Sequence, residues 1–171
     1  MTVLTQFTTQ QAEAAFNQLI ELLQNVVDDG ASIGFIAPLS REEAHAYWTK
    51  IIGDLDGGNR LLFVATENDQ ILGSVQLALE PRKNGEHRAE VQKLMVHTQA
   101  RNRGLGRRLM QAVEDAARAA NRSLIVLDTR RGDVADQLYQ KIGYIQAGII
   151  PRYALSSSGT FDDTVFYYRF I

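Results

Sequence analysis

Arg101-Asn102-Arg103-Gly104-Leu105-Gly106-Arg107-Arg108 is the stretch of sequence that decides the fold. It follows an apolar, strand-like segment ending in Leu94-Met95-Val96, and it opens a segment with helical spacing. The two glycines let the backbone turn sharply and approach a ligand closely. A helix beginning there offers free N–H groups and a positive dipole end, and the arginines add charge. The stretch therefore predicts a phosphate-binding turn; the alternative is a tight turn beside an arginine-rich surface.

The composition limits the function classes. The chain has 171 residues and a net charge of -2, so we expect one domain over 1–171 with no nucleic-acid partner. It has no cysteine, which excludes disulfides, thiolate metal sites and a cysteine nucleophile. His45, His87 and His97 show no metal-ligand spacing, so no metal is expected. We see neither a signal peptide nor an apolar stretch long enough to span a membrane, and we expect a cytoplasmic protein.

Hydrophobic periodicity gives the order of the elements. The pattern first predicts a strand over 2–8, a helix over 10–28 and an apolar loop over 30–39. A second helix follows, with a capping box at Ser40 and Glu43, and it stops at Gly57. The next elements are a hairpin of strands 60–67 and 71–80, which turns at 68–70, and a strand over 87–96. In the second half, the pattern predicts a helix after the arginine-glycine turn, a buried strand over 123–128, a helix over 133–142, and strands over 144–150 and 164–171. This order predicts an α/β fold in which a mixed, mostly antiparallel sheet contains a central parallel βαβ unit and carries helices on both faces.

Two motifs connect this order to a known family. The turn has the spacing Arg101-x-x-Gly104-x-Gly106, and Leu138-Tyr139-Gln140-Lys141-Ile142-Gly143-Tyr144 follows after the next strand. Both motifs, at this separation, resemble the GNAT superfamily of acetyl-CoA-dependent N-acetyltransferases. The resemblance implies a single GNAT-type domain, an enzyme with acetyl-CoA as co-substrate and an amine as acceptor. Relatives in this superfamily are often dimers, so the resemblance also makes a homodimer a possible state of this chain.

The resemblance assigns residues to the donor. Backbone N–H groups of the turn are expected to bind the pyrophosphate, with an additional contact from Arg103, Arg107 or Arg108. The strand before the turn is expected to pair with the pantetheine and to polarise the thioester carbonyl through a backbone N–H. The cofactor-binding residues predicted in this way are Leu94, Met95, Val96, Arg101, Asn102, Arg103, Gly104, Leu105, Gly106, Arg107 and Tyr139.

Three residues are candidates for catalysis. The resemblance makes Tyr139 the acid that protonates the CoA thiolate; the alternative is an aromatic ring packed on the sheet. Strand alternation places Glu90 on one face with Gln92, Leu94 and Val96, and Asp128 ends its strand at the edge where ligands bind. Glu90 and Asp128 are the candidate bases; the alternatives are an exposed glutamate and a loop-capping aspartate.

A narrower similarity concerns the acceptor. Gly30-Ala31-Ser32, the segment 84–96 and Leu127-Asp128-Thr129 resemble the tabtoxin-resistance enzymes of the superfamily, which acetylate a β-lactam toxin. The expected acceptor is therefore a small primary amine, with an amino acid-like toxin as one candidate and toxin or antibiotic resistance as a role. We expect the 30–39 loop and the helix after it to wall the acceptor cleft. Two alternatives stay open, namely a protein or peptide N-acetyltransferase and a non-catalytic acyl-CoA sensor.

Overall fold

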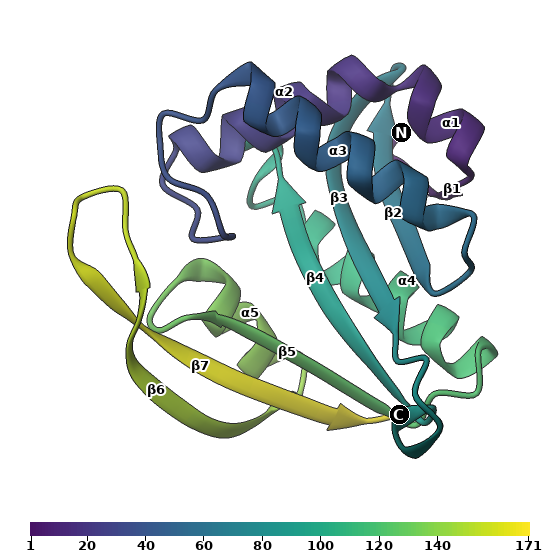
Figure 1. Ribbon diagram of the computed structural model, residues 1–171, viewed down its shortest axis with the longest axis vertical. Coiled ribbons are helices and arrows are strands. Elements are labelled where there is room, and N and C mark those ends of the chain that lie inside the picture. Colours follow the sequence, from purple (N-terminus) through teal and green to yellow (C-terminus); the bar gives the residue numbers. More distant parts are fainter.

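The structure is a computed structural model that describes residues 1–171, and one seven-stranded sheet organises it (Figure 1). The strands are β1 (Val3–Phe7), β2 (Arg60–Glu67), β3 (Gln70–Leu79), β4 (Arg88–Val96), β5 (Leu124–Arg130), β6 (Ile145–Leu155) and β7 (Phe161–Phe170). The helices are α1 (Thr9–Ala14), α2 (Phe16–Asp28), α3 (Arg41–Leu55), α4 (Leu105–Ala119) and α5 (Val134–Lys141), with 3-10 turns η1 (Lys83–Gly85) and η2 (Thr98–Ala100).

The sheet order is β1-β2-β3-β4-β5-β7-β6, and only β4 and β5 are parallel. The predicted mixed sheet with a central βαβ unit is therefore confirmed. The parallel pairing is short, because it joins Arg88–Glu90 to Leu124–Val126 and then stops. Beyond Glu90 the two strands diverge into a wedge, which Figure 1 shows between β4 and β5.

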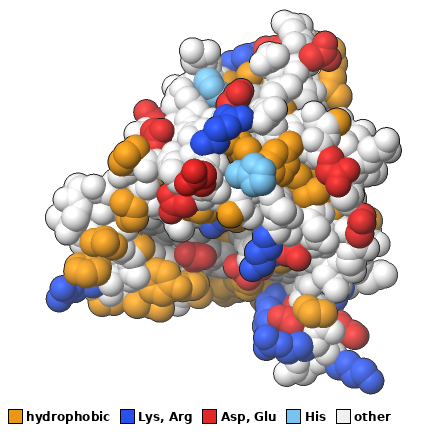
Figure 2. Space-filling model, turned by 45° about the horizontal axis from the view of Figure 1, so that its top comes forward, with side chains coloured by type: hydrophobic (Ala, Val, Ile, Leu, Met, Phe, Trp, Pro, Cys, Tyr) orange, Lys and Arg blue, Asp and Glu red, His pale blue; other side chains and the backbone are white.

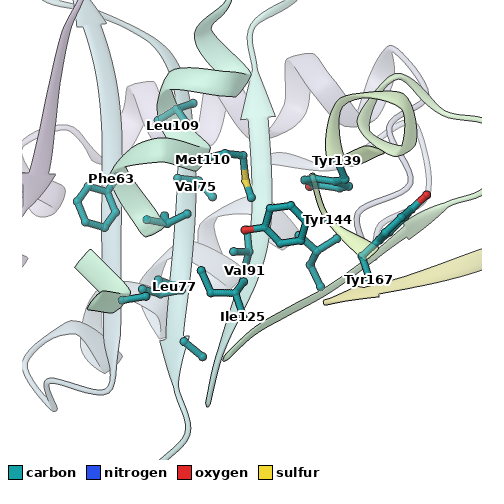
Figure 3. Packing of buried hydrophobic residues seen from close by; sticks show 14 of the residues in the cluster. Phe63, Val75, Leu77, Val91, Leu109, Met110, Ile125, Tyr139, Tyr144 and Tyr167 are labelled. Atoms are coloured by element: carbon teal, nitrogen blue, oxygen red, sulfur yellow. The ribbon is translucent and has the colours of Figure 1, made fainter. Parts of the chain in front are cut away.

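Helices cover both faces of the sheet, as the pattern predicted. One apolar cluster packs α1, α2 and α3 against β2 and β3 and includes the fully buried Trp48. The other packs α4 and α5 against the opposite face. Figure 3 shows this second cluster, in which Tyr139 lies beside Tyr144 and Tyr167. The two clusters fix the helices on either side of the wedge.

Several predicted boundaries need correction. The helix predicted over 10–28 is two helices, because the chain breaks at Ala15. The Ser40 hydroxyl caps α3 by accepting a hydrogen bond from the Glu43 backbone N–H. The Glu43 carboxylate accepts its hydrogen bond from the Ser40 hydroxyl and not from the Ser40 backbone N–H, so only half of the capping box is formed. A full box, which we did not predict, begins α1 at Thr8. The hairpin turn is two residues, both in the left-handed region, and Gln70 already pairs in β3.

β4 contains a bulge that changes the predicted faces. Gln76 pairs with Gln92 and Ser74 pairs with Met95, so β4 has one more residue than β3 over this interval. Lys93 lies in this interval with φ 51°. After the bulge, Met95 packs toward α2 and α3, whereas Leu94 and Val96 pack toward α4. The prediction that Glu90 shares a face with Leu94 and Val96 is therefore wrong.

The end of the sheet formed by β6 and β7 is long and partly apolar. β6 runs to Leu155, five residues past the predicted end of that strand, and it is an edge strand. Figure 2 shows hydrophobic side chains gathered at the lower left, on the side where Figure 1 draws this hairpin. The exposed hydrophobic residues of the hairpin are Ile145, Ile149, Ile150, Tyr153, Leu155, Phe161 and Phe170.

Candidate active site

A cavity of about 1110 Å³ occupies the wedge between β4 and β5. Its lining comes from the 29–34 loop, α3, β4, the arginine-glycine turn, the end of β5, the start of α5 and β6. The cavity therefore joins the turn, β4 and Tyr139 in one space, although they lie far apart along the chain. All the candidate site residues except Arg103 line it.

The arginine-glycine turn presents free backbone N–H groups. Asn102 and Gly104 adopt φ of 60° and 75°, and Gly104 is the N-cap of α4. No side chain caps α4, whereas Thr8, Ser40 and Asp133 cap α1, α3 and α5. The amides of its first turn are thus left for a ligand, and the dipole of a 15-residue helix favours an anion there.

The arginines of the turn have different partners. Arg101 forms an ion pair with Asp29, and Arg103 forms one with Glu67 at 2.7 Å. Arg108 donates to the Thr2 carbonyl at 3.0 Å. Arg107 lines the cavity and has no partner in the protein. The guanidinium groups of Arg101 and Arg103 therefore hold the turn in place, and Arg107 is the one that is free to meet an anion.

β4 offers an unpaired backbone edge to the cavity. Its other side is paired with β3 as far as Val96, but its β5 side is paired only as far as Glu90. N–H and C=O groups beyond Glu90 on that side have no strand partner, so an extended ligand can pair with them as an added strand. Gly73 on β3 makes room for this part of β4, because a Cβ there would lie 2.7 Å from the Met95 carbonyl oxygen.

Glu90 and Asp128 face each other across the narrow end of the wedge. Asp128 does not end β5 as predicted, because the strand continues to Arg130 and Asp128 pairs with Phe166 of β7. Desolvation raises the pKa of the Asp128 carboxyl, the negative charge of Glu90 raises it further, and Lys93 opposes both. Neither carboxylate has an ion-pair partner within 4 Å. Two unpaired carboxylates are available to bind and deprotonate an ammonium group.

Tyr139 reaches the same cavity from α5. Its side chain is 4% exposed and packs against Tyr144 and Tyr167, so the predicted alternative of a packed aromatic describes its ring correctly. Its hydroxyl makes no hydrogen bond within the protein, although Tyr139 lines the cavity. Burial raises the pKa of the Tyr139 phenol, and the charges of Asp128 and Asp133 add to the shift. The hydroxyl therefore stays protonated and is a free hydrogen-bond donor facing the cavity.

Sequence reasoning missed the polar floor of the cleft. Arg60 donates to Gln76 at 2.8 Å and to Gln92 at 2.9 Å, and Gln76 donates to the Tyr47 hydroxyl at 2.7 Å. Burial raises the pKa of Tyr47 to about 12. Polar residues on four separate elements meet here, and their spacing in the sequence gives no sign of it. Gln76 is fully buried, so this network fixes the floor rather than responding to a ligand.

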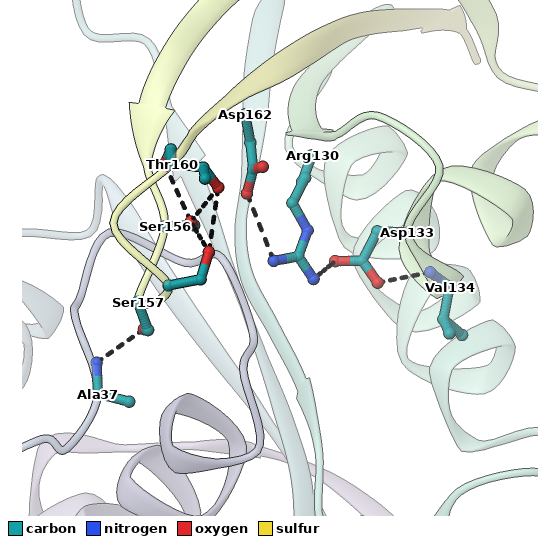
Figure 4. Close-up of polar contacts among 9 residues, drawn as sticks. Ala37, Arg130, Asp133, Val134, Ser156, Ser157, Thr160 and Asp162 are labelled. Atoms are coloured by element: carbon teal, nitrogen blue, oxygen red, sulfur yellow. Dashed lines mark hydrogen bonds and ion pairs between the residues drawn. The ribbon is translucent and has the colours of Figure 1, made fainter.

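Beyond Asp128 on β5, ion pairs and one loop contact hold neighbouring segments together (Figure 4). Arg130 pairs with Asp133 at 3.1 Å and with Asp162 at 3.6 Å. The backbone N–H of Ala37 donates to the Ser157 hydroxyl at 2.9 Å, joining the 31–39 loop to the β6–β7 loop. Residues 29–34 and α3 line the cavity, whereas 35–39 do not, and the role of this segment in walling the acceptor cleft stays a prediction.

Comparisons with known proteins agree with this geometry. The family model described as "Acetyltransferase (GNAT) family" matches residues 27–144. An uncharacterized N-acetyltransferase in the hisH-hisA intergenic region of Azospirillum brasilense is 37% identical over 117 residues, which are 67% of this chain and 67% of that protein. No helix of the chain is long and apolar enough to cross a membrane.

Two solved structures are similar over nearly the whole chain. A GCN5-related N-acetyltransferase from Kribbella flavida has a TM-score of 0.81 and 22% identity, covering 99% of this chain and 98% of that one. The protein yncA of Salmonella typhimurium, solved with its cofactor acetyl-CoA, has a TM-score of 0.78 and 17% identity, covering 99% and 94%. At these identities the two structures support the fold.

Proposed function

Because the chain belongs to the GNAT family of acetyltransferases, we propose that the wedge cavity is where it transfers an acetyl group from acetyl-CoA directly to a primary amine. The family resemblance and the N-acetyltransferase activity predicted from the two motifs are confirmed, and acetyl-CoA is the co-substrate typical of the family. The observation that carries the proposal is one continuous cavity, which connects the uncapped N-terminus of α4 to the Glu90–Asp128 pair.

The turn and β4 hold the donor in this proposal. The backbone N–H groups of 101–106 bind the pyrophosphate, and Arg107 adds a charge-assisted contact. The free edge of Leu94–Val96 pairs with the pantetheine, and a backbone N–H there donates to the thioester carbonyl oxygen. Arg103 contributes through its backbone, because its guanidinium pairs with Glu67.

Glu90 and Asp128 prepare the acceptor. Together they hold its ammonium group, and one of them takes a proton, directly or through water, so that the amine nitrogen has a free electron pair. The nitrogen forms its bond to the thioester carbon while the carbon–sulfur bond breaks. Desolvation, and then the charge of Glu90, raise the pKa of Asp128, so this carboxylate takes a proton more readily than an ordinary aspartate does.

Tyr139 completes the transfer. Its protonated hydroxyl, which has no partner in the protein, gives a proton to the departing CoA thiolate. The nitrogen loses two protons in all: the carboxylate releases the first to solvent, and the second leaves the nitrogen once the bond to the carbonyl carbon has formed. The tyrosine recovers its proton from solvent, so the products are an acetylated amine, CoA with a free thiol and one net proton. No covalent acyl-enzyme is required, which agrees with the absence of cysteine.

The acceptor we propose is a small primary amine, with an amino acid-like β-lactam toxin as the specific candidate from the narrower resemblance. The wall formed by the 31–39 loop and the β6–β7 loop supports a small acceptor, because the bond from Ala37 to Ser157 closes the gap between the two loops. A peptide acceptor needs that gap open. Toxin or antibiotic resistance as the biological role rests on the same resemblance.

The test is an acetyl-CoA consumption screen. Purified protein is given acetyl-CoA with a panel of amino acids, a tabtoxinine-like β-lactam, polyamines and a lysine peptide, and thiol release and acetylated product are both measured. We expect turnover of small amines and none of the peptide. Turnover of the peptide alone indicates a peptide acetyltransferase, and acetyl-CoA binding without any turnover indicates the sensor alternative. The predicted homodimer is tested separately, by sedimentation velocity.

A further inference from the structure

Lys93 carries the one cleft ammonium group that is half-buried and lacks an ionic partner. It lies at the β4 bulge with φ 51°, a left-handed conformation that is uncommon for lysine. Its Nζ donates to the Ile33 carbonyl, and no carboxylate lies within 4 Å of it. An ammonium has three donors, so two of them point elsewhere. A partly desolvated cation with unused donors is costly unless a ligand completes its contacts.

The surroundings hold this ammonium in place. Nζ lies 5.6 Å from the centroid of the Phe35 ring and 5.9 Å from that of Tyr47. A Cβ on Gly34 would lie 3.1 Å from Nζ, so the loop fits closely over the lysine. The two rings and the loop carbonyl restrict its movement and keep it in the cavity wall.

The other half-buried cations of the cleft already have carboxylate partners. Arg60 pairs with Asp54, and Arg130 pairs with Asp133 and Asp162. On β4 and β5, the unpaired charges that line the cavity are therefore Glu90, Asp128 and Lys93, while the unpaired Lys50 of α3 is exposed to solvent. Burial lowers the pKa of Lys93 below its usual value. The charges of Asp128 and Glu90 oppose this shift, and Arg60 adds to it, so the three unpaired groups influence one another.

We infer that Lys93 is a specificity-determining residue that binds the carboxylate of a zwitterionic acceptor whose amino group lies between Glu90 and Asp128. The inference rests on the proposed function, and it narrows the acceptor to amines that carry a carboxylate close by, as α-amino acids do. Two negative groups and one positive group match such a molecule. A polyamine would bring a second ammonium toward Lys93 and would be repelled.

The experiment compares matched acceptors. Initial rates with L-amino acids and with the corresponding L-amino acid amides give the ratio of kcat/KM for acid over amide. This ratio is measured for wild type, for K93M, which keeps the side-chain length without the charge, and for K93R. K83M is the matched control, because Lys83 is exposed on η1 outside the cavity and its loss changes the net charge equally.

A charge-assisted contact of this kind is expected to change the ratio by ~10–100-fold. K93M should lower the ratio by that factor because kcat/KM falls for the amino acid and stays unchanged for the amide. K93R and K83M should keep most of the wild-type ratio. Comparing ratios between variants cancels the different basicity of acids and amides. An unchanged ratio in K93M overturns the inference, as does equal loss with acid and amide. If K93M does not fold, the ratio measured for the wild type tests the inference, since equal kcat/KM for amino acids and their amides also overturns the inference. Turnover of no amine at all overturns the proposed function as well.

Discussion

Replacing Tyr139 by phenylalanine separates a catalytic role from a packing role. The substitution removes one hydroxyl and leaves the ring, which packs at 5.9 Å from Tyr144 and 6.1 Å from Tyr167, centroid to centroid. The hydroxyl faces the cavity and makes no hydrogen bond within the protein, so its removal leaves no protein group without a partner. The free energy of unfolding should therefore stay the same or rise by up to ~1 kcal/mol. Loss of a general acid lowers kcat by ~10²–10⁴-fold, equivalent to ~3–5 kcal/mol in the barrier.

The assay measures kcat with saturating acetyl-CoA alongside urea unfolding of the same preparation. Tyr144→Phe is the matched control, because Tyr144 is 5% exposed in the same cluster, its hydroxyl also lacks a partner, and it does not line the cavity. We expect kcat to fall in Tyr139→Phe and to change less than ~2-fold in the control. A normal kcat in Tyr139→Phe, or an equal fall in both variants, would refute the assignment of Tyr139 as the acid.

Four further predictions concern the pair of carboxylates and the glycines. Glu90→Gln removes the charge that raises the pKa of Asp128, so the acidic limb of the kcat/KM profile should move to lower pH; an unmoved limb contradicts the coupling. The pKa of Asp128 is raised in the folded state, so its ionisation destabilises the fold as pH rises. Asp128→Asn should therefore raise Tm at pH 7 and abolish the acidic limb of the kcat/KM profile. A lower Tm would contradict the raised pKa. Gly104→Ala and Gly159→Ala both force alanine into a left-handed backbone, with φ 75° and 83°, so each should lower the free energy of unfolding by ~1–2 kcal/mol. Calorimetry should show weaker acetyl-CoA binding for Gly104→Ala and unchanged binding for Gly159→Ala, which is the control. Gly73→Ala should cost ~1–3 kcal/mol of unfolding free energy, since its Cβ meets β4 at 2.7 Å, and an unchanged Tm would show that β4 shifts freely.

The sequence allowed the fold and the donor half of the site to be predicted because their signals are local. Helical spacing, the two glycines of the turn and the short apolar β5 each fix one element without reference to the others. The bulge in β4 was not predicted, because strand alternation assumes regular pairing with β3. Gly73 was the available signal, since a glycine inside a strand often faces a bulge or a close backbone contact.

The acceptor half depends on contacts between distant segments. Lys93 meets the 30–39 loop, and Arg60 meets two glutamines on neighbouring strands. No spacing along the chain reveals such meetings, so only the fold shows that Lys93 lies in the cavity wall. Arg103 and Arg108 illustrate the converse, because local charge made their side chains candidates for a ligand contact, whereas they contact Glu67 and the Thr2 carbonyl.

A crystal structure of the protein with acetyl-CoA tests the central claim most directly. The claim is that one cavity brings the cofactor thioester to Tyr139 and the carboxylate pair. We predict the pyrophosphate on the backbone N–H groups of 101–106, the pantetheine along Leu94–Val96, and the cofactor sulfur within hydrogen-bonding reach of the Tyr139 hydroxyl. Acetyl-CoA bound outside the wedge, or with its sulfur directed away from Tyr139, would contradict the account.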